Sequence, residues 1–301
     1  GGEPLLEFDM LEELVLFAEK ELAGKKINYT LTTNAVLLTD RIIEFFIQHQ
    51  IDILISLDGS KESHDKNRVF AATGKGTFDS IIHKLREISV KYPDYFKKLT
   101  INMVMDPSTD FDVFTDLFKQ YPFMKKVNVM STIVDDIGSE VKNVYKEEFT
   151  AKERYHIFLR YLNVFDRMPN NLCTPVFSSQ TGALKEIGSI VSERDQLPQK
   201  TVPSGPCVPG EVRLMVTVDG KFILCERVSE ISDPMCIGNI NDGMDFKKIY
   251  DLLNVAQTTS EHCRNCWAFS LCNLCVKYSD KDNTLSAGSR RCRKICSLLG
   301  Y

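Results

Sequence analysis

The chain has 301 residues, of which 43% are hydrophobic, and its formal net charge is −4. This length allows one large domain or two ordinary ones with a sizeable core, and the acidic balance argues against a broad nucleic-acid-binding surface. No apolar run approaches the roughly 18 residues of a membrane-spanning helix, and no signal peptide opens the sequence. We therefore expect a cytoplasmic protein without a membrane or nucleic-acid partner.

The first half of the chain alternates short apolar runs with amphipathic stretches. In the stretch 39–50, for example, Ile42, Ile43, Phe46 and Ile47 recur at helical spacing and predict one buried face. Strands are predicted over residues 27–33, 51–57, 99–105 and 127–133, and helices over residues 8–22, 39–50, 78–91, 111–120 and 146–168. Strands that alternate with helices at this spacing predict repeated βα units around a parallel sheet.

Polar or glycine-containing turns follow three of these predicted strands. They are Thr33-Asn34, Asp58-Gly59 and Asp106-Pro107. Because ligands of parallel α/β folds bind at the carboxyl ends of the strands, we expect a binding site there. The sequence opens on Gly1-Gly2-Glu3-Pro4 directly before a predicted helix, a pattern typical of a strand end. We therefore expect the chain to begin within a repeating unit.

The pattern changes near Cys173. Residues 169–206 contain five prolines and show weak periodicity, so we interpret them as a bridge. Two apolar runs, 211–218 and 221–224, then flank Asp219-Gly220, which predicts a β-hairpin. The sequence thus predicts a first domain over residues 1–168, the bridge, and a second domain over residues 207–301.

Cysteine is absent from the first 172 residues, and nine of the ten cysteines lie between Cys207 and Cys296. Disulfides are dense in small secreted scaffolds, whereas clustered thiols in a chain without a secretion signal favour metal. The spacing C-x2-C-x5-C-x2-C over residues 263–275 lets paired thiolates reach one centre from tight turns. These residues predict two sites of three or four thiolates each, which hold zinc or iron–sulfur clusters.

The cysteine layout resembles the SPASM domain of radical S-adenosylmethionine enzymes over residues 207–296. The shared features are a first cysteine, a Gly-x4-Cys step that ends at Cys225, and the C-x2-C-x5-C run. The interval from Cys272 to Cys275 is x2 where the family has x3, which leaves the ligand role of Cys275 open. The resemblance implies a first auxiliary four-iron cluster on Cys207, Cys225 and Cys275, and a second on Cys263, Cys266, Cys272 and Cys292. Cys296 is the alternative to Cys292, Cys236 is either a further ligand or a buried thiol, and Cys173 is interpreted as structural.

Motifs of the first half resemble the same family. Gly1-Gly2-Glu3 resembles the motif that holds the methionine ammonium of S-adenosylmethionine, and Thr33 with Asn34 resembles the strand end that faces the ribose. The stretch from Ser56-Leu57-Asp58-Gly59 through His64-Asp65 to Arg68 resembles a third family motif. This resemblance implies that Ser56, Asp58 and Arg68 bind the cofactor, with Arg68 pairing with its carboxylate. His64 is expected at the surface with no role beyond orienting its loop, and no catalytic acid or base is identified.

The family binds its catalytic cluster through C-x3-C-x2-C, and this sequence contains no such motif. We expect those thiolates, with the first strands of the barrel, upstream of Gly1. The resemblance implies an α/β fold: a partial (β/α)6 TIM-type barrel lacking its first strands, then a small cysteine-rich SPASM domain with a β-hairpin. It implies S-adenosylmethionine, two auxiliary 4Fe-4S clusters in this chain and one catalytic 4Fe-4S cluster upstream as cofactors.

Enzymes with this architecture commonly modify peptides. The resemblance implies a maturase that installs a cross-link, most specifically a thioether, in a ribosomally made precursor peptide, with flavodoxin or ferredoxin as the electron donor. Only three cysteines match the first auxiliary site, which leaves room for a substrate sulfur. The alternatives are a formylglycine-forming sulfatase-maturating enzyme and carbon–carbon cross-linking. Two further alternatives are not enzyme reactions of this kind: a zinc-binding interaction module and an electron-transfer protein.

Overall fold

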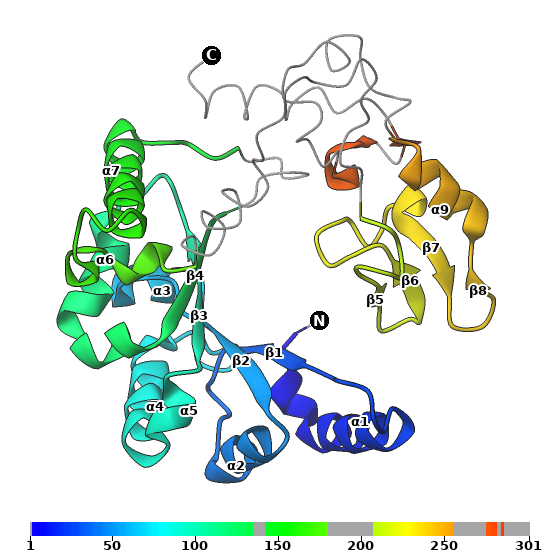
Figure 1. Ribbon diagram of the computed structural model, residues 1–301, viewed down its shortest axis with the longest axis horizontal. Helices are drawn as coiled ribbons and strands as arrows, with labels where there is room; N and C mark the ends of the chain where they lie inside the picture. Colours follow the sequence, from blue (N-terminus) through cyan, green and yellow to red (C-terminus); the bar gives the residue numbers. More distant parts are fainter. Residues whose placement is uncertain (1, 135–141, 180–206, 256–274, 282–283, 286–301) are drawn as a thin grey trace. The chain divides into compact units, whose positions relative to one another are not determined.

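The computed structural model describes residues 2–134, 142–179, 207–255, 275–281 and 284–285 (Figure 1). The chain divides into two compact units, residues 2–193 and 194–301. Among the described residues, no helix combines the length and the apolarity needed to cross a lipid bilayer.

The first unit is built on a parallel sheet with the strand order β1-β2-β3-β4. The strands are β1 (Tyr29–Thr33), β2 (Ile51–Ser56), β3 (Thr100–Met105) and β4 (Asn128–Ile133). Thr33 lies opposite Ile55, Ile55 opposite Ile101, and Met105 opposite Ile133. This register brings the carboxyl ends of all four strands to one edge of the sheet, where we predicted the binding site.

Helices connect these strands and lie along one side of the curved sheet, as Figure 1 shows. They are α1 (Phe8–Glu21), α2 (Asp40–Gln48), α3 (Lys61–Asp65), α4 (Phe78–Lys91), α5 (Pro93–Phe96), α6 (Asp112–Gln120) and α7 (Glu147–Val164). Short 3-10 turns are η1 (Pro4–Glu7), η2 (Pro122–Lys126), η3 (Asn170–Leu172) and η4 (Pro175–Phe177). The helices α3 and α5 were not predicted, because an element of four or five residues is too short to show helical periodicity.

The two faces of the sheet differ in character because successive side chains of a strand point to opposite faces. Ile53, Ile55 and Ile101 point toward the helices and are almost fully buried. Thr32 and Asn102 occupy the alternate positions and are exposed and half-buried, respectively. The sheet therefore has one helix-covered hydrophobic face and one face with polar side chains.

The helix-covered core contains an aromatic cluster centred on Phe111, which is fully buried. Its ring contacts the rings of Phe149, His156 and Phe177, with centroid separations of 5.6, 5.3 and 5.8 Å. Phe177 belongs to η4, at the start of the segment that we interpreted as a bridge. This part of the bridge packs into the first unit, since Val176 and Phe177 are both buried there.

The helix α7 ends earlier than the sequence predicted, at Val164 rather than at residue 168. Asp166 adopts a left-handed conformation with φ of 54°, and the Arg167 amide donates to the Leu162 carbonyl at 2.8 Å. This turn reverses the chain and terminates the helix.

The second unit contains a four-stranded antiparallel sheet with the order β5-β6-β7-β8. Its elements are β5 (Met215–Val216), β6 (Lys221–Ile223), η5 (Asp233–Met235), β7 (Cys236–Asn239), β8 (Gly243–Met244) and α9 (Phe246–Leu253). A second pair, β9 (Asp280–Lys281) and β10 (Thr284–Leu285), follows η8 (Val276–Tyr278). Ile223, Met235, Ile237 and Leu252 form the buried centre of this unit.

The predicted hairpin exists across Asp219-Gly220, although β5 covers only two residues of the run 211–218. Gly220 has a φ of 74°, and a Cβ at this position would lie 2.9 Å from the Ile240 side chain, so the turn requires glycine. The predicted α/β class, with a parallel helix-covered sheet followed by a separate small unit that contains a hairpin, is confirmed.

Candidate functional site

The carboxylate of Glu3 ties the start of the chain to the end of β1. Its Oε1 accepts hydrogen bonds from the Thr33 hydroxyl at 2.7 Å and from the Leu5 amide at 3.1 Å. Its Oε2 accepts one from the Asn34 amide at 2.7 Å. Gly2, Glu3, Thr33 and Asn34, which the sequence assigned to one site from two separate motifs, thus lie together.

The turn after β1 holds a non-glycine residue in a strained conformation. Ala35 is fully buried and has a φ of 62°. The Thr33 hydroxyl accepts a hydrogen bond from the Ala35 amide at 3.0 Å, and the Asn34 side chain accepts one from the Val36 amide at 3.0 Å. Left-handed backbone at such a residue costs about 1 kcal/mol or more and persists where the surroundings fix it, as happens at binding sites.

The side chain of Asp58 joins the end of β2 to β3 and to Arg68. Its Oδ1 accepts the Val104 amide at 2.9 Å, and its Oδ2 accepts Nε of Arg68 at 2.5 Å. The Arg68 side chain is 31% exposed, and its terminal nitrogens make no hydrogen bond within the part of the chain that the structure describes. Asp58 therefore holds the guanidinium through Nε and leaves its other donors for a ligand.

The prediction that His64 lies at the surface is wrong. Its ring is fully buried and packs edge-on against Phe78, with the ring centroids 5.9 Å apart. The Asp58 amide donates to His64 Nδ1 at 3.2 Å, and His64 Nε2 lies 2.9 Å from the Thr77 hydroxyl. Because Nδ1 accepts, the hydrogen of the neutral ring is on Nε2 and is donated to Thr77.

Burial lowers the pKa of His64 to about 4, and the nearby charge of Asp58 only partly opposes this effect. The unfolded chain binds this proton near pH 6.5, whereas the folded protein binds it only near pH 4. Because the unfolded chain takes up this proton at a higher pH than the folded protein, acid favours the unfolded state. The free energy of unfolding therefore decreases as the pH falls from about 6.5 to about 4. We expect the free energy of unfolding to decrease by about 3 kcal/mol more between pH 7 and pH 4 in the wild type than in His64→Leu.

Urea denaturation at several pH values measures this difference. His83→Gln is the matched control, because the His83 side chain is 73% exposed on α4. This variant is expected to keep the pH dependence of the wild type. Equal pH dependence in the wild type and in His64→Leu would contradict the role of burial.

Asp65, the neighbour of His64, fixes the beginning of α4. Its Oδ1 accepts a hydrogen bond from the Phe78 amide at 3.0 Å. A Cβ at Gly76 would lie 1.9 Å from the Asp65 carboxyl carbon, so this close approach requires glycine. Nothing in the sequence indicated that Thr77 belongs to the hydrogen-bond network of His64 and Arg68. A threonine directly before a helix is typical of an N-cap, yet its hydroxyl bonds His64 and makes no capping bond.

These contacts place two sets of predicted residues at the ends of adjacent strands. Ser56, buried at the end of β2, lies opposite Asn102, and β2 pairs directly with β1. Glu3 Oε2 accepts a single hydrogen bond among the described residues, so it retains capacity for an ammonium, while Arg68 retains donors for a carboxylate. The arrangement fits a ligand with both groups, such as an amino acid. Gly1 lies outside the described residues.

The described cysteines are all free thiols. Cys207, Cys225, Cys236 and Cys275 belong to the second unit, whereas Cys173 is buried in the first unit, where its thiol donates to the Leu159 carbonyl at 3.5 Å. The pKa of Arg213 is raised chiefly by its hydrogen bond with Glu226, and the nearby Cys225 and Cys207 sulfurs raise it further.

Cys207 and Cys225, two of the ligands predicted for the first cluster, both lie near the guanidinium of Arg213. No group of three metal-ligating side chains occurs among the described residues. Cys275, the third ligand predicted for the first cluster, is described as well. The four ligands predicted for the second cluster lie outside the described residues: Cys263, Cys266, Cys272 and Cys292, with the alternative Cys296.

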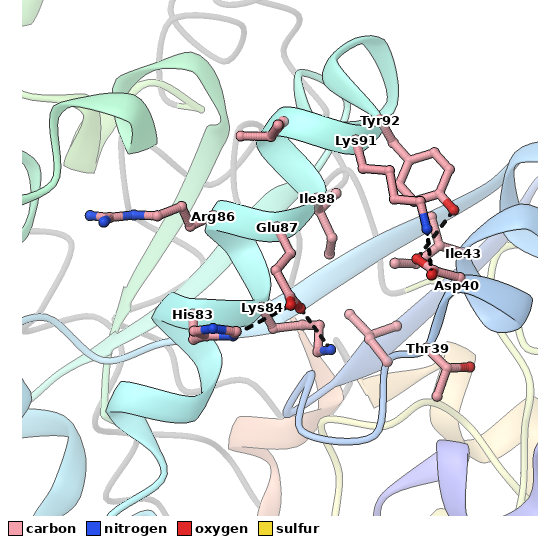
Figure 2. Close-up of a pocket in the computed structure, with 12 residues that line it drawn as sticks. Thr39, Asp40, Ile43, His83, Lys84, Arg86, Glu87, Ile88, Lys91 and Tyr92 are labelled. Carbon is pink, nitrogen blue, oxygen red and sulfur yellow. Dashed lines mark hydrogen bonds and ion pairs between the residues drawn. The ribbon is translucent and has the colours of Figure 1, made fainter.

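A separate pocket of about 650 Å³ lies between α2 and α4 (Figure 2). None of the predicted cofactor residues lines it. Most of its charged side chains pair with one another: Lys91 bonds Asp40, and Glu87 bonds Lys84 and His83. The exception is Arg86, whose guanidinium lies over the Phe123 ring, 5.6 Å from the ring centroid. Apart from Arg86, the charged side chains that line the pocket are therefore paired with one another.

No protein-family model matches the chain. A curated relative, the cysteine-type anaerobic sulfatase-maturating enzyme of Clostridium perfringens, is 22% identical over 97% of this chain and 73% of its own length. An uncharacterized protein of Methanocaldococcus jannaschii is 33% identical over 82% of this chain and 73% of its own. The radical SAM cyclopropyl synthase TigE of Paramaledivibacter caminithermalis is 27% identical over 50% of this chain and 30% of its own.

The fold is shared with solved structures. A structure of an anaerobic sulfatase-maturating enzyme with bound AdoMet and a peptide (Cp18Cys) superimposes with a TM-score of 0.70 at 21% identity. The match covers 100% of this chain and 81% of that chain.

Proposed function

We propose that the chain, whose relatives are radical S-adenosylmethionine enzymes, is such an enzyme and acts as a maturase that installs a thioether cross-link in a ribosomally made peptide. The observation that carries the proposal is that two charged groups near the ends of the adjacent strands β1 and β2 both keep unused hydrogen-bonding capacity. The carboxylate of Glu3 and the guanidinium of Arg68 suit the ammonium and the carboxylate of a methionine moiety. Relatives and fold neighbours that act on or bind peptides support the peptide substrate.

In this proposal the chain's own residues bind and orient the cofactor. Gly2 and Glu3 face the ammonium, Arg68 pairs with the carboxylate, and Thr33 with Asn34 lies beside the nucleoside. Ser56 contributes a hydroxyl near the end of β2. Asp58 acts through Arg68 and does not contact the cofactor itself, because both of its oxygens already accept hydrogen bonds from the protein.

The second unit is proposed to be a SPASM domain that holds two auxiliary 4Fe-4S clusters. Free, unbridged thiols at Cys207, Cys225 and Cys275 suit iron ligation. When bound, the cofactor and clusters would supply the one-electron oxidation that a thioether requires. One C–H and one S–H bond of the peptide break and one C–S bond forms, so a hydrogen atom would go to the 5′-deoxyadenosyl group of the cofactor, a proton to solvent and an electron to the bound clusters. A flavodoxin or ferredoxin is the proposed source of the initiating electron.

Formylglycine formation in a sulfatase is the second candidate. The name of the Clostridium relative favours it, and that relative matches nearly all of this chain. The two reactions differ in the fate of the substrate sulfur, which a thioether retains and a formylglycine residue loses. The same experiment can therefore decide between them.

The test uses the full-length protein, reconstituted with iron and sulfide without oxygen, and a cysteine-containing precursor peptide encoded near its gene. We expect S-adenosylmethionine to be cleaved and the peptide to lose two hydrogen atoms, retain its sulfur and resist thiol alkylation. Mass spectrometry of the intact and fragmented peptide measures all three changes. A peptide with its cysteine replaced by alanine is the control and should remain unmodified.

Loss of the sulfur with gain of an aldehyde that reacts with an aminooxy probe would favour formylglycine formation instead. A protein that contains zinc and no iron would contradict both reactions and indicate an interaction module. Iron–sulfur clusters without cleavage of S-adenosylmethionine would indicate an electron-transfer protein.

A further inference from the structure

We propose that His64 and Thr77 are positioning residues, which orient the Arg68 guanidinium toward the cofactor through a closed ring of hydrogen bonds. This inference rests on the proposed function, because it assigns Arg68 to the carboxylate of S-adenosylmethionine. Neither His64 nor Thr77 touches the ligand in this proposal. Both act through Arg68.

The ring runs through four residues and returns to its start. The Asp58 amide donates to His64 Nδ1 at 3.2 Å, and His64 Nε2 donates to the Thr77 hydroxyl at 2.9 Å. The Thr77 hydroxyl donates to the Arg68 carbonyl at 3.2 Å. Arg68 Nε then donates to the Asp58 carboxylate at 2.5 Å and closes the ring.

The hydrogen bonds of the ring can run in only one direction, from donor to acceptor. The backbone amide of Asp58 can only donate, and the carbonyl of Arg68 can only accept. Between them, neutral His64 with its hydrogen on Nε2 and the Thr77 hydroxyl each accept one bond and donate the next. Protonated His64 would turn an N–H toward the Asp58 amide and break the ring. The charged groups that act on His64 are Asp58, Asp65 and Arg68.

The ring fixes Arg68 at both ends of its side chain. At the backbone, the Arg68 carbonyl also accepts the Thr77 amide at 3.2 Å, and the Arg68 amide donates to the His64 carbonyl at 3.0 Å. At the other end, Nε is held by Asp58. The side chain therefore loses its freedom before a ligand arrives, and its two terminal nitrogens remain as donors. Such preorganisation raises affinity by reducing the entropy lost on binding.

The alternative is that Thr77 only stabilises the loop between α3 and α4. Residues 69–76 form a short hairpin, in which Val69 pairs with Gly76 and the Phe70 amide donates to the Lys75 carbonyl at 2.8 Å. A purely structural role would change stability without a specific effect on cofactor affinity. The experiment must therefore separate these two quantities.

The test measures the Kd for S-adenosylmethionine of the full-length, cluster-reconstituted enzyme by isothermal titration calorimetry. Thr77→Val removes the hydroxyl and nearly preserves the volume, and we expect a roughly tenfold increase of the Kd. Thr77→Ser keeps the hydroxyl, and its Kd should stay within about twofold of the wild-type value. The cleavage rate at saturating cofactor should remain close to that of the wild type, because no reacting group is altered.

Thr115→Val is the matched control. Thr115 is buried like Thr77, and its hydroxyl donates to a backbone carbonyl, that of Asp112, at 3.1 Å. Its loss should lower stability without changing the Kd. Equal Kd values for Thr77→Val and Thr115→Val would overturn the positioning role alone. A wild-type enzyme with intact clusters that binds no S-adenosylmethionine would overturn the proposed function, and the positioning role with it.

Discussion

Replacing Phe111 with alanine is expected to lower the free energy of unfolding of the first unit by about 3–5 kcal/mol. The ring is fully buried and contacts the rings of Phe114, Phe149, His156 and Phe177. These residues come from α6, α7 and η4, which cannot all move inward to fill the space. Urea denaturation followed by far-UV circular dichroism measures the change. The first transition must be assigned to its unit, because two compact units need not unfold together.

Phe17→Ala provides the comparison for Phe111→Ala. The Phe17 side chain lies on α1 and is 63% exposed, so its removal creates no cavity. We expect a change within about 0.5 kcal/mol. Comparable losses in the two variants would contradict the assignment of Phe111 to the centre of the core.

Asp58→Asn is expected to have the largest effect on cofactor binding. Both oxygens of Asp58 accept hydrogen bonds from N–H donors, Val104 N and Arg68 Nε. The asparagine amide must therefore point its NH2 group at one of these donors, whichever way it is turned. We expect a loss of about 2–3 kcal/mol in the free energy of unfolding and a roughly 100-fold increase of the Kd for S-adenosylmethionine. Denaturation and calorimetry of the reconstituted enzyme measure the two quantities.

The control for Asp58→Asn is Asp116→Asn, which removes one carboxylate charge from the surface of α6. Asp116 pairs with Lys119 at 2.7 Å, and both side chains are exposed, so this pair contributes little. Stability should change by less than about 0.5 kcal/mol, and the Kd should stay the same. If Asp58→Asn bound the cofactor as tightly as Asp116→Asn, Arg68 would not depend on Asp58 for its position.

Local patterns predicted the elements of the first unit closely. The helix over residues 78–91 begins and ends where its periodicity indicated, and each predicted strand agrees with the structure to within two residues. The reason is that one face of each element is buried, so apolar residues recur with a period of 3.6 residues in a helix and 2 residues in a strand. The short strands β7 and β8 carry no such repeat and were missed.

The candidate site was only partly predictable. Glu3, Thr33 and Asn34 were found through motifs, but the hydrogen bonds that join them cross about thirty positions of sequence. Val104 and Thr77 carried no signal, because one contributes only its backbone amide and the other lies where a helix cap is expected. Their roles depend on what the fold brings beside them.

The sequence by itself determined the alternation of strands and helices, the edge of the sheet where the candidate site lies, and the separate cysteine-rich region. These properties follow from periodicity, turn chemistry and spacing, which are local. Only the tertiary structure decided that His64 is buried and neutral and that the Asp58 carboxylate holds Arg68 through a hydrogen bond. It alone also decided that Thr77 completes the ring of hydrogen bonds between His64 and Arg68. Burial and hydrogen-bond partnership depend on residues from different elements, and no single stretch of sequence contains that information.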